Sequence, residues 1–591
     1  MTEPKSHSPR RAALLAWWMI VLSLFFFATV EKVHGAEDGS VQIKVDQVGY
    51  LPGAAKVAMV AAPEESDKPL TTFEVKRASD NASVFKGWLN DQHFDADTGD
   101  SVYLADFTAL HEAGTYYLDV PRAGKSWTFS IRPDVFERPY YLAMRAFYGQ
   151  RCGTAVDLGP EFPGYAHAAC HLKGEFHSSS GKQGERDNVG GWHDAGDYGR
   201  YMVNSGITTG TLLWTWEIYG AKVKSIKLNI PESGNGTPDI LNEARWNLEW
   251  MLKMQDDDGG VWHKQTSERF PGFIMPEDDH TVSEVIGTGQ APYKSTCATA
   301  DLVAVGAIAA RVYQPFDAKF AARSLEAARK AWLWTEQNPN VTFRNPPGVG
   351  TGEYGDNNCS DERLWAAAEL WRTTGEAAYN DYFVKHYPEF RAALDTLSPE
   401  GWREVAPMGL WAYALGTQKG ADTDVAADIR KRTAAAARAI VEHTRKNPYR
   451  VSLLTKDYVW GSNGVVANYG MELLVANALS PDPSFVESAQ DNLHYLLGRN
   501  TFSLSWVTQV GANPYRHPHH RPSGAGKTAE PWPGLLSGGP NAARQDAVLK
   551  RLPQGLPPAK IYADDLGSYA SNEICINWQA ALVFLLAGTL P

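Results

Sequence analysis

The hydrophobic pattern divides the chain into two parts. From residue 41 to about residue 133, apolar and polar residues alternate with a period of two, as at Val41, Ile43 and Val45. Turn-forming clusters such as Leu51-Pro52-Gly53 separate the short alternating segments. Alternation interrupted by turns at this spacing predicts a small all-β sandwich of about 95 residues.

After Pro133 the apolar residues recur every three or four positions, which predicts helices. We expect about twelve of them, at residues 141–150, 201–219, 238–255, 296–313, 318–337, 361–374, 377–394, 407–415, 421–445, 465–479, 484–497 and 573–586. Helices in this number, joined by long loops rich in Gly and Pro, are typical of an α/α toroid or a helical solenoid. No repeat of fixed length is visible, which disfavours the solenoid.

The first 36 residues have the features of a secretory signal peptide. Arg10-Arg11 precede an apolar run from Ala12 to Val30, and small residues near Ala36 offer a cleavage site. The run is almost long enough to cross a bilayer, so an uncleaved anchor is the alternative. No later segment resembles a spanning helix, and we expect no other membrane contact. The pattern predicts export to the periplasm or to the outside.

Composition restricts the class of partner. The 591 residues include 56 Lys and Arg against 68 Asp and Glu, so the net charge is −12. An acidic balance without a basic cluster argues against nucleic acid. The 20 Trp and 25 Tyr suit stacking on sugar rings, although aromatic side chains fill cores equally well. No pattern in the sequence specifies an oligomeric state.

The segment from Gly190 to Gly199 carries two carboxylates three positions apart, Asp194 and Asp197. Gly196 lies between them and permits a tight loop in which both carboxylates face one cleft. Such a pair can orient a water molecule and take its proton, provided that one carboxylate is ionised. The alternative is an Asp-Gly loop that only caps the following helix.

Two later segments also concentrate polar side chains. His519 and Arg521 lie in a Pro-rich loop, where they suit binding to hydroxyls or to a leaving-group oxygen. A solvated basic loop is the alternative. Further on, Asp564 is followed by Glu573, which we expect to open the last apolar helix. An acid in that place can also serve simply to face the helix dipole.

Taken together, the three segments resemble glycoside hydrolase family 9, the inverting cellulases with an (α/α)6 barrel. The segments occur in the family's order, and the strand-rich region resembles the immunoglobulin-like domain that precedes many of these barrels. The resemblance implies a mainly α protein with a signal peptide at residues 1–36, an immunoglobulin-like sandwich at 40–133 and an (α/α)6-barrel catalytic domain at 137–591.

By this resemblance Asp197 is the catalytic base, Asp194 helps to position the attacking water, and Glu573 is the general acid. The family's sugar-site and acid-tuning residues correspond to His519, Arg521 and Asp564. In an inverting enzyme the acid and the base stand roughly 6.5–9.5 Å apart, and the acid needs a raised pKa. We expect the charge of Asp564, nine residues before Glu573, to raise that pKa.

The implied activity is endo cleavage of β-1,4-glucosidic bonds in cellulose or related β-glucans, with inversion. One alternative is an exo-acting β-glucosidase or glucosaminidase on oligosaccharides. Another is a non-catalytic carbohydrate-binding protein. The joint presence of Asp194, Asp197 and Glu573 argues against the latter, because binding alone requires no separated acid and base.

Candidate platforms for sugar rings are Trp192, Trp460 and Tyr569, with core packing as the alternative. The chain departs from the family at two positions after Glu573. Cys575 stands where a small Ser, Thr or Ala is usual, and Gln579 stands where Asn is usual. We expect both departures to affect packing more than chemistry.

A candidate zinc site combines two thiolates with two imidazoles, from Cys152, Cys170, His171 and His193. Its spacing is unlike that of a zinc finger, and spacing alone favours a Cys152–Cys170 disulfide in an exported protein. The family resemblance implies a structural zinc instead, since relatives with the immunoglobulin-like domain carry similarly placed ligands. The remaining cysteines, predicted to be separate buried thiols, are Cys297, Cys359 and Cys575.

Calcium is a further candidate ligand. The oxygen-rich loop 352–358 contains Asp356 and is followed by Asp361, a composition that suits a hard cation. A second loop at 231–237 has a similar composition, and neither follows the EF-hand order. Loops that only cap helices are the alternative for both. No organic cofactor is implied.

Overall fold

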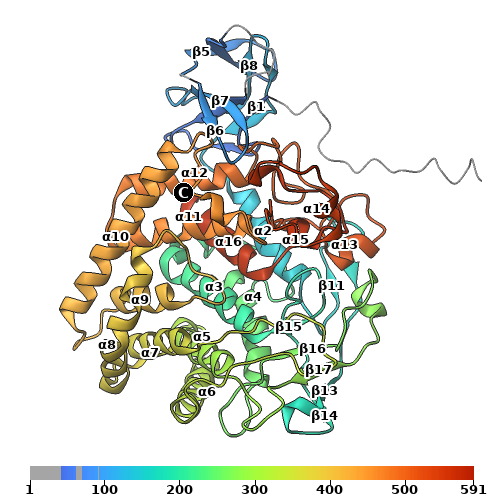
Figure 1. Ribbon diagram of the computed structural model, residues 1–591, viewed down its shortest axis with the longest axis vertical. Helices are drawn as coiled ribbons and strands as arrows, with labels where there is room; N and C mark the ends of the chain where they lie inside the picture. The colour runs from blue at the N-terminus through green and yellow to red at the C-terminus, as the bar shows by residue number, and fades with distance from the viewer. Residues whose placement is uncertain (1–41, 62–68, 91) are drawn as a thin grey trace, which may run out of the picture.

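The computed structural model describes residues 42–61, 69–90 and 92–591. The predicted signal peptide at residues 1–36 lies outside the described residues. A β-sandwich stands at one end of the molecule, and the helices form the larger body beneath it (Figure 1).

The sandwich consists of two sheets. One sheet has the order β1-β3-β7-β6, and the other has the order β2-β10-β8-β4-β5, with β9 paired to β8. The strands are β1 Ile43–Lys44, β2 Gly49–Tyr50, β3 Val57–Ala61, β4 Thr72–Arg77, β5 Ser83–Trp88, β6 His93–Asp95, β7 Asp100–Asp106, β8 Gly114–Val120, β9 Gly124–Lys125 and β10 Phe129–Ile131.

Side chains alternate along β7, so the sheet that contains this strand faces one core on each side. Tyr103 and Ala105 point into the core of the sandwich, whereas Val102 belongs to the core of the helical body. Polar contacts reinforce this junction, because Asp100 accepts hydrogen bonds from the Tyr449 hydroxyl at 2.6 Å and the Lys560 ammonium at 2.7 Å. The sandwich is therefore packed against the barrel rather than tethered by a linker.

Among the described residues, twelve helices have ten or more residues, and they form two concentric rings. The inner ring closes in the order α3 Met202–Val223, α5 Thr296–Tyr313, α7 Ser360–Thr374, α9 Ala406–Leu415, α11 Ser462–Leu479 and α16 Ile576–Thr589. Each inner helix packs on one outer partner, in the same order α4 Asp239–Lys253, α6 Ala318–Gln337, α8 Ala377–Phe390, α10 Thr423–Lys446, α12 Pro483–Leu496 and α2 Glu137–Gly149.

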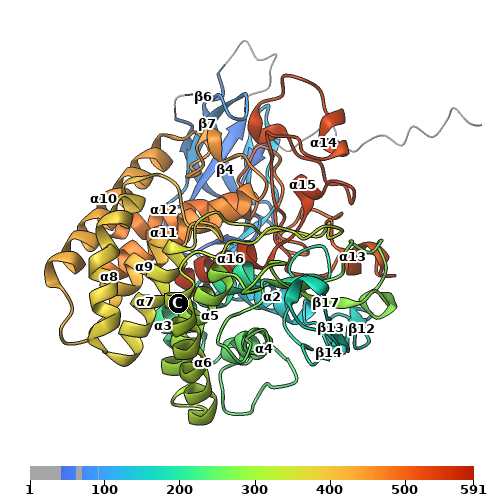
Figure 2. The same ribbon diagram turned by 60° about the horizontal axis from the view of Figure 1, so that its bottom comes forward.

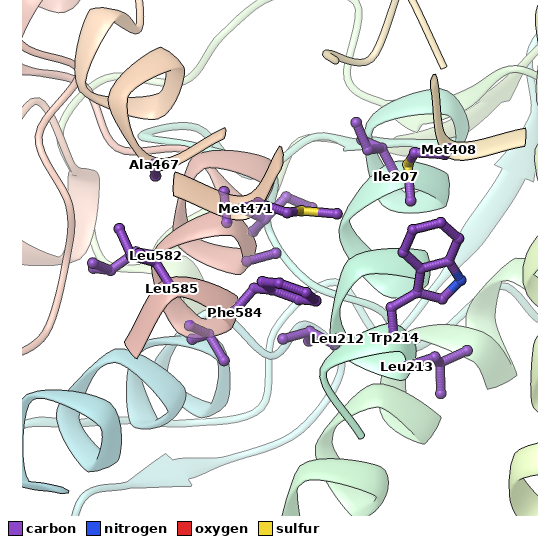
Figure 3. Close-up of a cluster of buried hydrophobic side chains, with 14 of the residues drawn as sticks. Ile207, Leu212, Leu213, Trp214, Met408, Ala467, Met471, Leu582, Phe584 and Leu585 are labelled. Carbon is purple, nitrogen blue, oxygen red and sulfur yellow. The ribbon is translucent and has the colours of Figure 1, made fainter. Parts of the chain in front are cut away.

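The two rings differ in their sequence because they bury different amounts of surface. Inner helices such as α5 and α16 are buried on almost every side, whereas an outer helix such as α10 has one buried stripe and a charged outer face. Figure 2 shows α8 and α10 on the outside of the barrel. Residues Leu212 of α3, Met471 of α11 and Phe584 of α16 meet at the centre (Figure 3). These contacts close the (α/α)6 barrel.

One helix within the described residues, α5, is long and apolar enough to cross a membrane. It is 94% buried inside the protein and packs against α3, α6 and α7. Its composition therefore reflects its place in the inner ring.

The loops of the barrel carry three short helices and a small sheet. The helices are α13 Arg521–Ala525, α14 Ala547–Arg551 and α15 Tyr569–Asn572. The sheet has the order β14-β13-β17-β16-β15, and a separate pair is formed by β11 and β12. The bounds are β11 Val156–Asp157, β12 Ala166–His167, β13 Gly174–Phe176, β14 Glu185–Arg186, β15 Arg200–Tyr201, β16 Lys264–Thr266 and β17 Ser283–Ile286.

Every one of the twelve predicted helices overlaps an observed one, but the start of the last helix is different. Helix α16 begins at Ile576, and Glu573 lies before it in an extended segment that bridges to His519. The backbone N–H of Ile576 donates to the Asp194 carbonyl instead of continuing the helix backwards. Glu573 is therefore not a first-turn acid facing the helix dipole.

The cysteines also differ from expectation. Cys297 and Cys359 form a disulfide, so the prediction of three separate thiols is wrong. The two residues are 62 positions apart, but one lies in the first turn of α5 and the other caps the neighbouring inner helix α7. Cys152 and Cys170 are free thiols, so the alternative disulfide between them is not formed. Cys575 is free and buried, as predicted.

Candidate active site

A cleft of about 1040 Å³ opens at the loops that join the barrel helices. It brings together residues from all three sequence segments, among them Asp194, Asp197, His519, Arg521, Tyr569 and Glu573. Trp192 and Asp564 do not line it. Residues separated by nearly 400 positions thus share one cavity, as the three-segment interpretation requires.

The Asp194–Asp197 loop packs against the backbone of the second segment. A Cβ atom on Gly196 would lie 2.0 Å from the His519 carbonyl oxygen, so only glycine fits at this position. The backbone N–H of Arg521 donates to the Gly196 carbonyl at 3.1 Å, and its guanidinium Nη1 donates to the same oxygen at 2.7 Å. Arg521 therefore fixes the loop that holds the paired carboxylates.

Both oxygens of Asp194 are occupied by hydrogen-bond donors. Its Oδ1 accepts from Asn204 Nδ2 at 2.7 Å, and its Oδ2 accepts from the Tyr354 hydroxyl at 2.6 Å. Burial, and then the charge of Asp197, raises the pKa of Asp194 to about 8. The two donors hold this carboxyl in one orientation.

Asp197 has a more open environment. Its Oδ2 accepts hydrogen bonds from the Gly199 backbone N–H at 2.9 Å and the Tyr201 hydroxyl at 3.1 Å. Its Oδ1 receives no hydrogen bond from the residues that the structure describes, and the side chain lines the cleft. Asp197 can therefore accept a proton from a water molecule in the cleft, whereas Asp194 is fully engaged.

Glu573 lies at the wall of the cleft, partly buried. Burial, and then the charges of Asp197 and Asp194, raises its pKa well above the ordinary value. Arg521 acts in the opposite direction, with a smaller effect. A carboxyl in this environment retains its proton at a pH where an exposed glutamate has lost it, as a general acid requires.

Asp564 has a different place from the one predicted. It accepts hydrogen bonds from the backbone N–H groups of Arg516 and His517, each at 2.7 Å, and from Asn572 Nδ2 at 3.0 Å. The like charges that raise the pKa of Glu573 belong to Asp197 and Asp194 instead. Asp564 therefore joins the His519 loop to the residue before Glu573, and a direct effect of its charge on the pKa of the acid stays a prediction.

His519 is oriented by one backbone contact. Its Nδ1 lies 2.7 Å from the Leu566 carbonyl, so Nδ1 carries a proton and, in the neutral ring, Nε2 is an acceptor. Burial lowers the pKa of His519, which favours that neutral form. The ring also contacts the edges of Phe273 and Tyr569.

The three predicted aromatic platforms separate into two groups. Trp192 is fully buried, packs on Phe147 and donates its Nε1–H to Glu243 at 2.9 Å, so it is a core residue and no platform. Trp460 and Tyr569 line the cleft, with 39% and 38% of their surfaces exposed, and their ring centres lie 5.4 Å apart. These two remain candidates.

Sequence analysis missed further residues of the cleft. Trp402, Trp578 and Phe270 line it, and Tyr354 contacts Asp194. None of them stands in a motif, although Tyr354 lies in the loop that was examined as a calcium site. Their positions depend on how loops from separate helix pairs converge.

The two departures from the family have different consequences. Gln579 serves packing, as expected, because it accepts from the Leu536 N–H and donates to the carbonyls of Ala143 and Gly534. Cys575 instead belongs to the site, since its Sγ lies 3.2 Å from Asn204 Nδ2 and 3.6 Å from the Tyr354 hydroxyl. Both of these groups also contact Asp194, so the thiol touches the hydrogen-bond network of that carboxyl.

Next to the paired carboxylates, the four predicted zinc-ligand residues form one cluster. One ligand atom from each of the four lies within 4.8 Å of the others, in Cys152, Cys170, His171 and His193. Cys152 Sγ is 3.7 Å from His171 Nδ1, and Cys170 Sγ is 3.7 Å from His193 Nε2. Outside the cluster, His171 Nε2 contacts Asp279 at 3.2 Å. The residues thus form a candidate metal site with a supporting carboxylate.

A second group of acids lies around the N-terminal ends of the neighbouring inner helices α5 and α7. We call it the acidic cluster, and its members are Asp301, Asp356, Asp361 and Glu362. All four are buried. Both carboxylate oxygens of Asp301 and of Glu362, and Oδ2 of Asp356, have no hydrogen-bond partner within the described part of the chain. The cluster contains both residues predicted to bind calcium.

The fold and the site together define a class of protein. A cleft that is edged by flat aromatic rings and contains a carboxyl with a raised pKa near an open carboxylate is the site of a glycoside hydrolase of the acid–base type. The model of glycosyl hydrolase family 9 matches residues 136–586, and the model of the cellulase N-terminal ig-like domain matches residues 38–125. The chain belongs to glycosyl hydrolase family 9.

Individual relatives agree over almost the whole length. Endoglucanase D of Acetivibrio thermocellus is 37% identical over 550 residues, which cover 93% of this chain and 83% of that protein. A cellodextrinase of Butyrivibrio fibrisolvens is 33% identical and covers 93% of this chain and 100% of its own. A solved metagenome-derived family 9 endoglucanase superposes with a TM-score of 0.85 at 37% identity, covering 93% and 99% of the two chains.

Proposed function

We propose that the protein is an inverting endo-β-1,4-glucanase in which Asp197 is the base and Glu573 is the acid. The observation that carries this proposal is the asymmetry of the carboxyls in one cleft. Glu573 has a raised pKa, Asp194 is held by two donors, and Asp197 has one oxygen open to the cleft. Relatives with endoglucanase and cellodextrinase names support a β-glucan substrate.

In the proposed mechanism each group has one task. Glu573 donates its proton to the glycosidic oxygen as the bond to the anomeric carbon breaks. Asp197 takes a proton from a water molecule that attacks that carbon from the opposite face. Tyr354 donates a hydrogen bond to Asp194 and so holds this neighbouring carboxyl in place. His519 Nε2 can accept a hydrogen bond from a sugar hydroxyl, and Arg521 keeps the Asp loop in position.

Aromatic side chains supply the binding surface for the sugar chain. Trp460 and Tyr569 offer adjacent faces, and Trp402 lines another part of the cleft. Sugar rings bury their apolar faces on such rings, while the hydroxyls bind polar groups at the edges. A cleft of about 1040 Å³ lies at the upper end of the usual range for small-molecule sites, which suits an oligosaccharide or a segment of a polymer.

The cysteine and histidine cluster fits a structural zinc ion. Zinc bonds of about 2.3 Å to sulfur and 2.0–2.1 Å to nitrogen place tetrahedral ligand atoms roughly 3.6 Å apart. The two measured S···N distances are both 3.7 Å. His193 directly precedes Asp194, so zinc would fix the loop that carries the paired carboxylates. The contact of His171 with Asp279 is of the kind that orients a ligating imidazole.

The acidic cluster fits calcium. Five carboxylate oxygens without partners, on Asp301, Asp356 and Glu362, are donors that a hard cation prefers. Burial, and then the charges of Asp361 and Asp356, raises the pKa of Asp301 well above normal. Calcium here would fix the loop that contains Tyr354.

Export and domain organisation belong to the same proposal. A disulfide between Cys297 and Cys359 is typical of an oxidising compartment, which supports export to the periplasm or the outside. The last sandwich strand ends at Ile131 and the first barrel helix begins at Glu137, which supports domains at residues 40–133 and 137–591.

Product analysis tests the proposed function. The purified enzyme should lower the viscosity of carboxymethyl-cellulose rapidly, and the α-anomer should appear first in the proton NMR spectrum of fresh cello-oligosaccharide products. Slow viscosity loss with steady release of one small sugar would favour exo action instead. Absence of hydrolysis of both substrates would overturn the assignment.

A further inference from the structure

Lys264 is a buried lysine beside the cleft to which the proposed mechanism gives no task. It begins β16 and is completely buried, so it does not touch a substrate in the cleft. Its ammonium donates to neutral acceptors, namely Asn345 Oδ1 at 2.7 Å, the carbonyls of Thr351 and Gly352 at 3.4 and 2.7 Å, and Thr351 Oγ1 at 3.1 Å. Removing an ammonium from water without an ionic partner is costly, so the position of this charge needs a reason.

The small sheet places Lys264 close to the carboxylate that we propose as the base. Lys264 pairs directly with Tyr201 of β15, and its ammonium lies 5.6 Å from the centre of the Tyr201 ring. A cation at this distance from an aromatic face is attracted to it. The hydroxyl of the same tyrosine donates to Asp197 Oδ2 at 3.1 Å. The Tyr201 side chain therefore connects the ammonium with Asp197.

The same ammonium holds the loop that carries Tyr354. The loop is bound at two successive residues, Thr351 and Gly352. Two residues after Gly352, the Tyr354 hydroxyl donates to Asp194 Oδ2 at 2.6 Å. Lys264 is thus connected to both carboxylates of the Asp194–Asp197 loop, to one through a tyrosine ring and to the other through a short backbone segment.

Electrostatic attraction also links Lys264 with Asp197. Burial lowers the pKa of Lys264 to about 7, and the charge of Asp197 is the largest effect in the opposite direction, followed by that of Glu353. The lysine therefore carries its proton below pH 7. Because the attraction is mutual, the cation stabilises the ionised form of Asp197.

The other titratable groups around this pair include two that act against the base. The groups that face Asp197 or Lys264 are Asp194, Tyr201, His263, Glu353, His519 and Glu573. Among them, Asp194 and Glu573 are like charges that disfavour the ionised form of Asp197. Lys264 is a buried cation that offsets them.

We propose that Lys264 is a positioning residue that keeps Asp197 ionised and holds the loop of Tyr354 against Asp194. This inference rests on the proposed function, in which Asp197 accepts the proton of the attacking water. Lys264 touches neither the substrate nor the reacting atoms, and it acts through Tyr201 and residues 351–354. A lysine with a purely structural role would support the loop and leave the ionisation of the base unchanged.

The pH dependence of kcat/KM on cello-oligosaccharides tests the inference, because its acidic limb reports the ionisation of the base in the free enzyme. Lys264→Gln keeps a donor for the loop but removes the charge. Its acidic limb should move to higher pH by about 0.5–1 unit, the size expected for one charge several ångströms away in protein surroundings. Lys264→Met should show the same shift. Lys264→Arg keeps the charge, and its limb should stay within about 0.2 unit of the wild type.

Lys294→Gln is the matched control. Lys294 is also buried, but it pairs with Asp256 at 2.6 Å and Asp258 at 3.1 Å, so its loss should leave the acidic limb in place. Tm values check the folding of each variant. Since Lys264 does not touch the substrate, Lys264→Gln should lower kcat by roughly tenfold and change KM by less than about threefold.

The possible failures of the inference and of the proposed function are distinguishable. An active Lys264→Gln variant whose acidic limb does not move would overturn the inference alone, and so would an equal shift in Lys264→Arg. An acidic limb that is unchanged in Asp197→Ala would show that another group is the base. That result would overturn the proposed function and the inference with it.

Discussion

The cleft and the acidic cluster both gather several acids, yet they are built for different purposes. In both, burial and like charges raise pKa values, as at Glu573 and at Asp301. In the cleft, the oxygens of Asp194 have donors and Asp197 has one oxygen open to the cavity. In the acidic cluster, both oxygens of Asp301 and of Glu362 are buried without partners. Partner count and access to the cleft, rather than burial, distinguish the proposed proton-transfer site from the proposed cation site.

The largest effect is expected from the open carboxylate. Asp197→Ala should lower kcat on cello-oligosaccharides by roughly 10²–10⁴, because it removes the carboxylate proposed to take the proton of the attacking water. Initial rates measure this loss, with Tm as the check on folding. Sodium azide, a nucleophile that needs no base, should restore turnover and give an α-glycosyl azide. A loss below tenfold would remove Asp197 from the role of base.

Asp301→Asn tests the other side of the comparison. Calcium at 100 times its Kd should stabilise the wild type by about 2.7 kcal/mol, and the variant should lose most of this gain. In EDTA, the variant should be more stable than the wild type, because it has one fewer acidic group in a buried cluster that then has no cation. Calorimetric scans with CaCl₂ and with EDTA measure both states. Activity at 25 °C should remain within about threefold, and a much larger loss would assign the acidic cluster to the chemistry.

Tyr354→Phe tests the connection between the two regions, because Tyr354 contacts Asp194 in the cleft and lies in the same loop as Asp356 of the acidic cluster. The substitution removes the 2.6 Å hydrogen bond to Asp194 and leaves the ring in place. Such a bond to a carboxyl contributes about 1.5–3 kcal/mol, so we expect kcat to fall by roughly tenfold or more with little change in KM. The comparison variant Tyr569→Phe keeps its ring face and should change kcat by less than about threefold. Equal effects of the two variants would contradict a positioning role for Tyr354.

A further buried acid, Glu400, sharpens the comparison through its pH dependence. Glu400 is buried, both of its oxygens lack partners among the described residues, and burial raises its pKa to about 8. The folded state therefore keeps a proton that the unfolded chain releases above about pH 4.5. The folded state therefore has its full stability below about pH 4.5 and loses stability as the pH rises towards 8. Glu400→Gln should match the wild type near pH 4.5 and exceed it by about 1–3 kcal/mol at pH 8.

Denaturant unfolding at the two pH values measures this difference. A gap that stays constant with pH would mean that Glu400 does not titrate in this range. Glu376→Gln, at a far more exposed position, is a control and should show no gap at either pH.

The sequence predicted the helices well because the inner ring imposes a strong pattern. Helices such as α5 are apolar on every side, and their length and caps are visible locally. The loop with the paired aspartates was also predictable from local sequence, because Gly196 indicates a tight turn beside two acids. The pairing of Cys297 with Cys359 was not, because it depends on α5 and α7 being neighbours in the ring.

Other errors come from side chains that have two possible environments. Trp192 stands next to the catalytic loop in sequence, but its indole turns inward to Glu243. Asp301 lies within a long apolar helix, and the neighbouring acids Asp361 and Glu362 come from the next inner helix. Cys575 contacts Tyr354, which is 221 positions earlier. Contacts of this kind are set by the closure of the barrel and leave no local pattern.

The most direct test of the account compares Glu573→Gln on two substrates. On cello-oligosaccharides, whose leaving group needs a proton, kcat should fall by roughly 10²–10⁴. On 2,4-dinitrophenyl cellobioside, whose leaving group departs as a stable anion, the loss should be less than about tenfold. That selective loss is the result predicted for a general acid. An equal loss on both substrates, or full activity on the oligosaccharides, would contradict it.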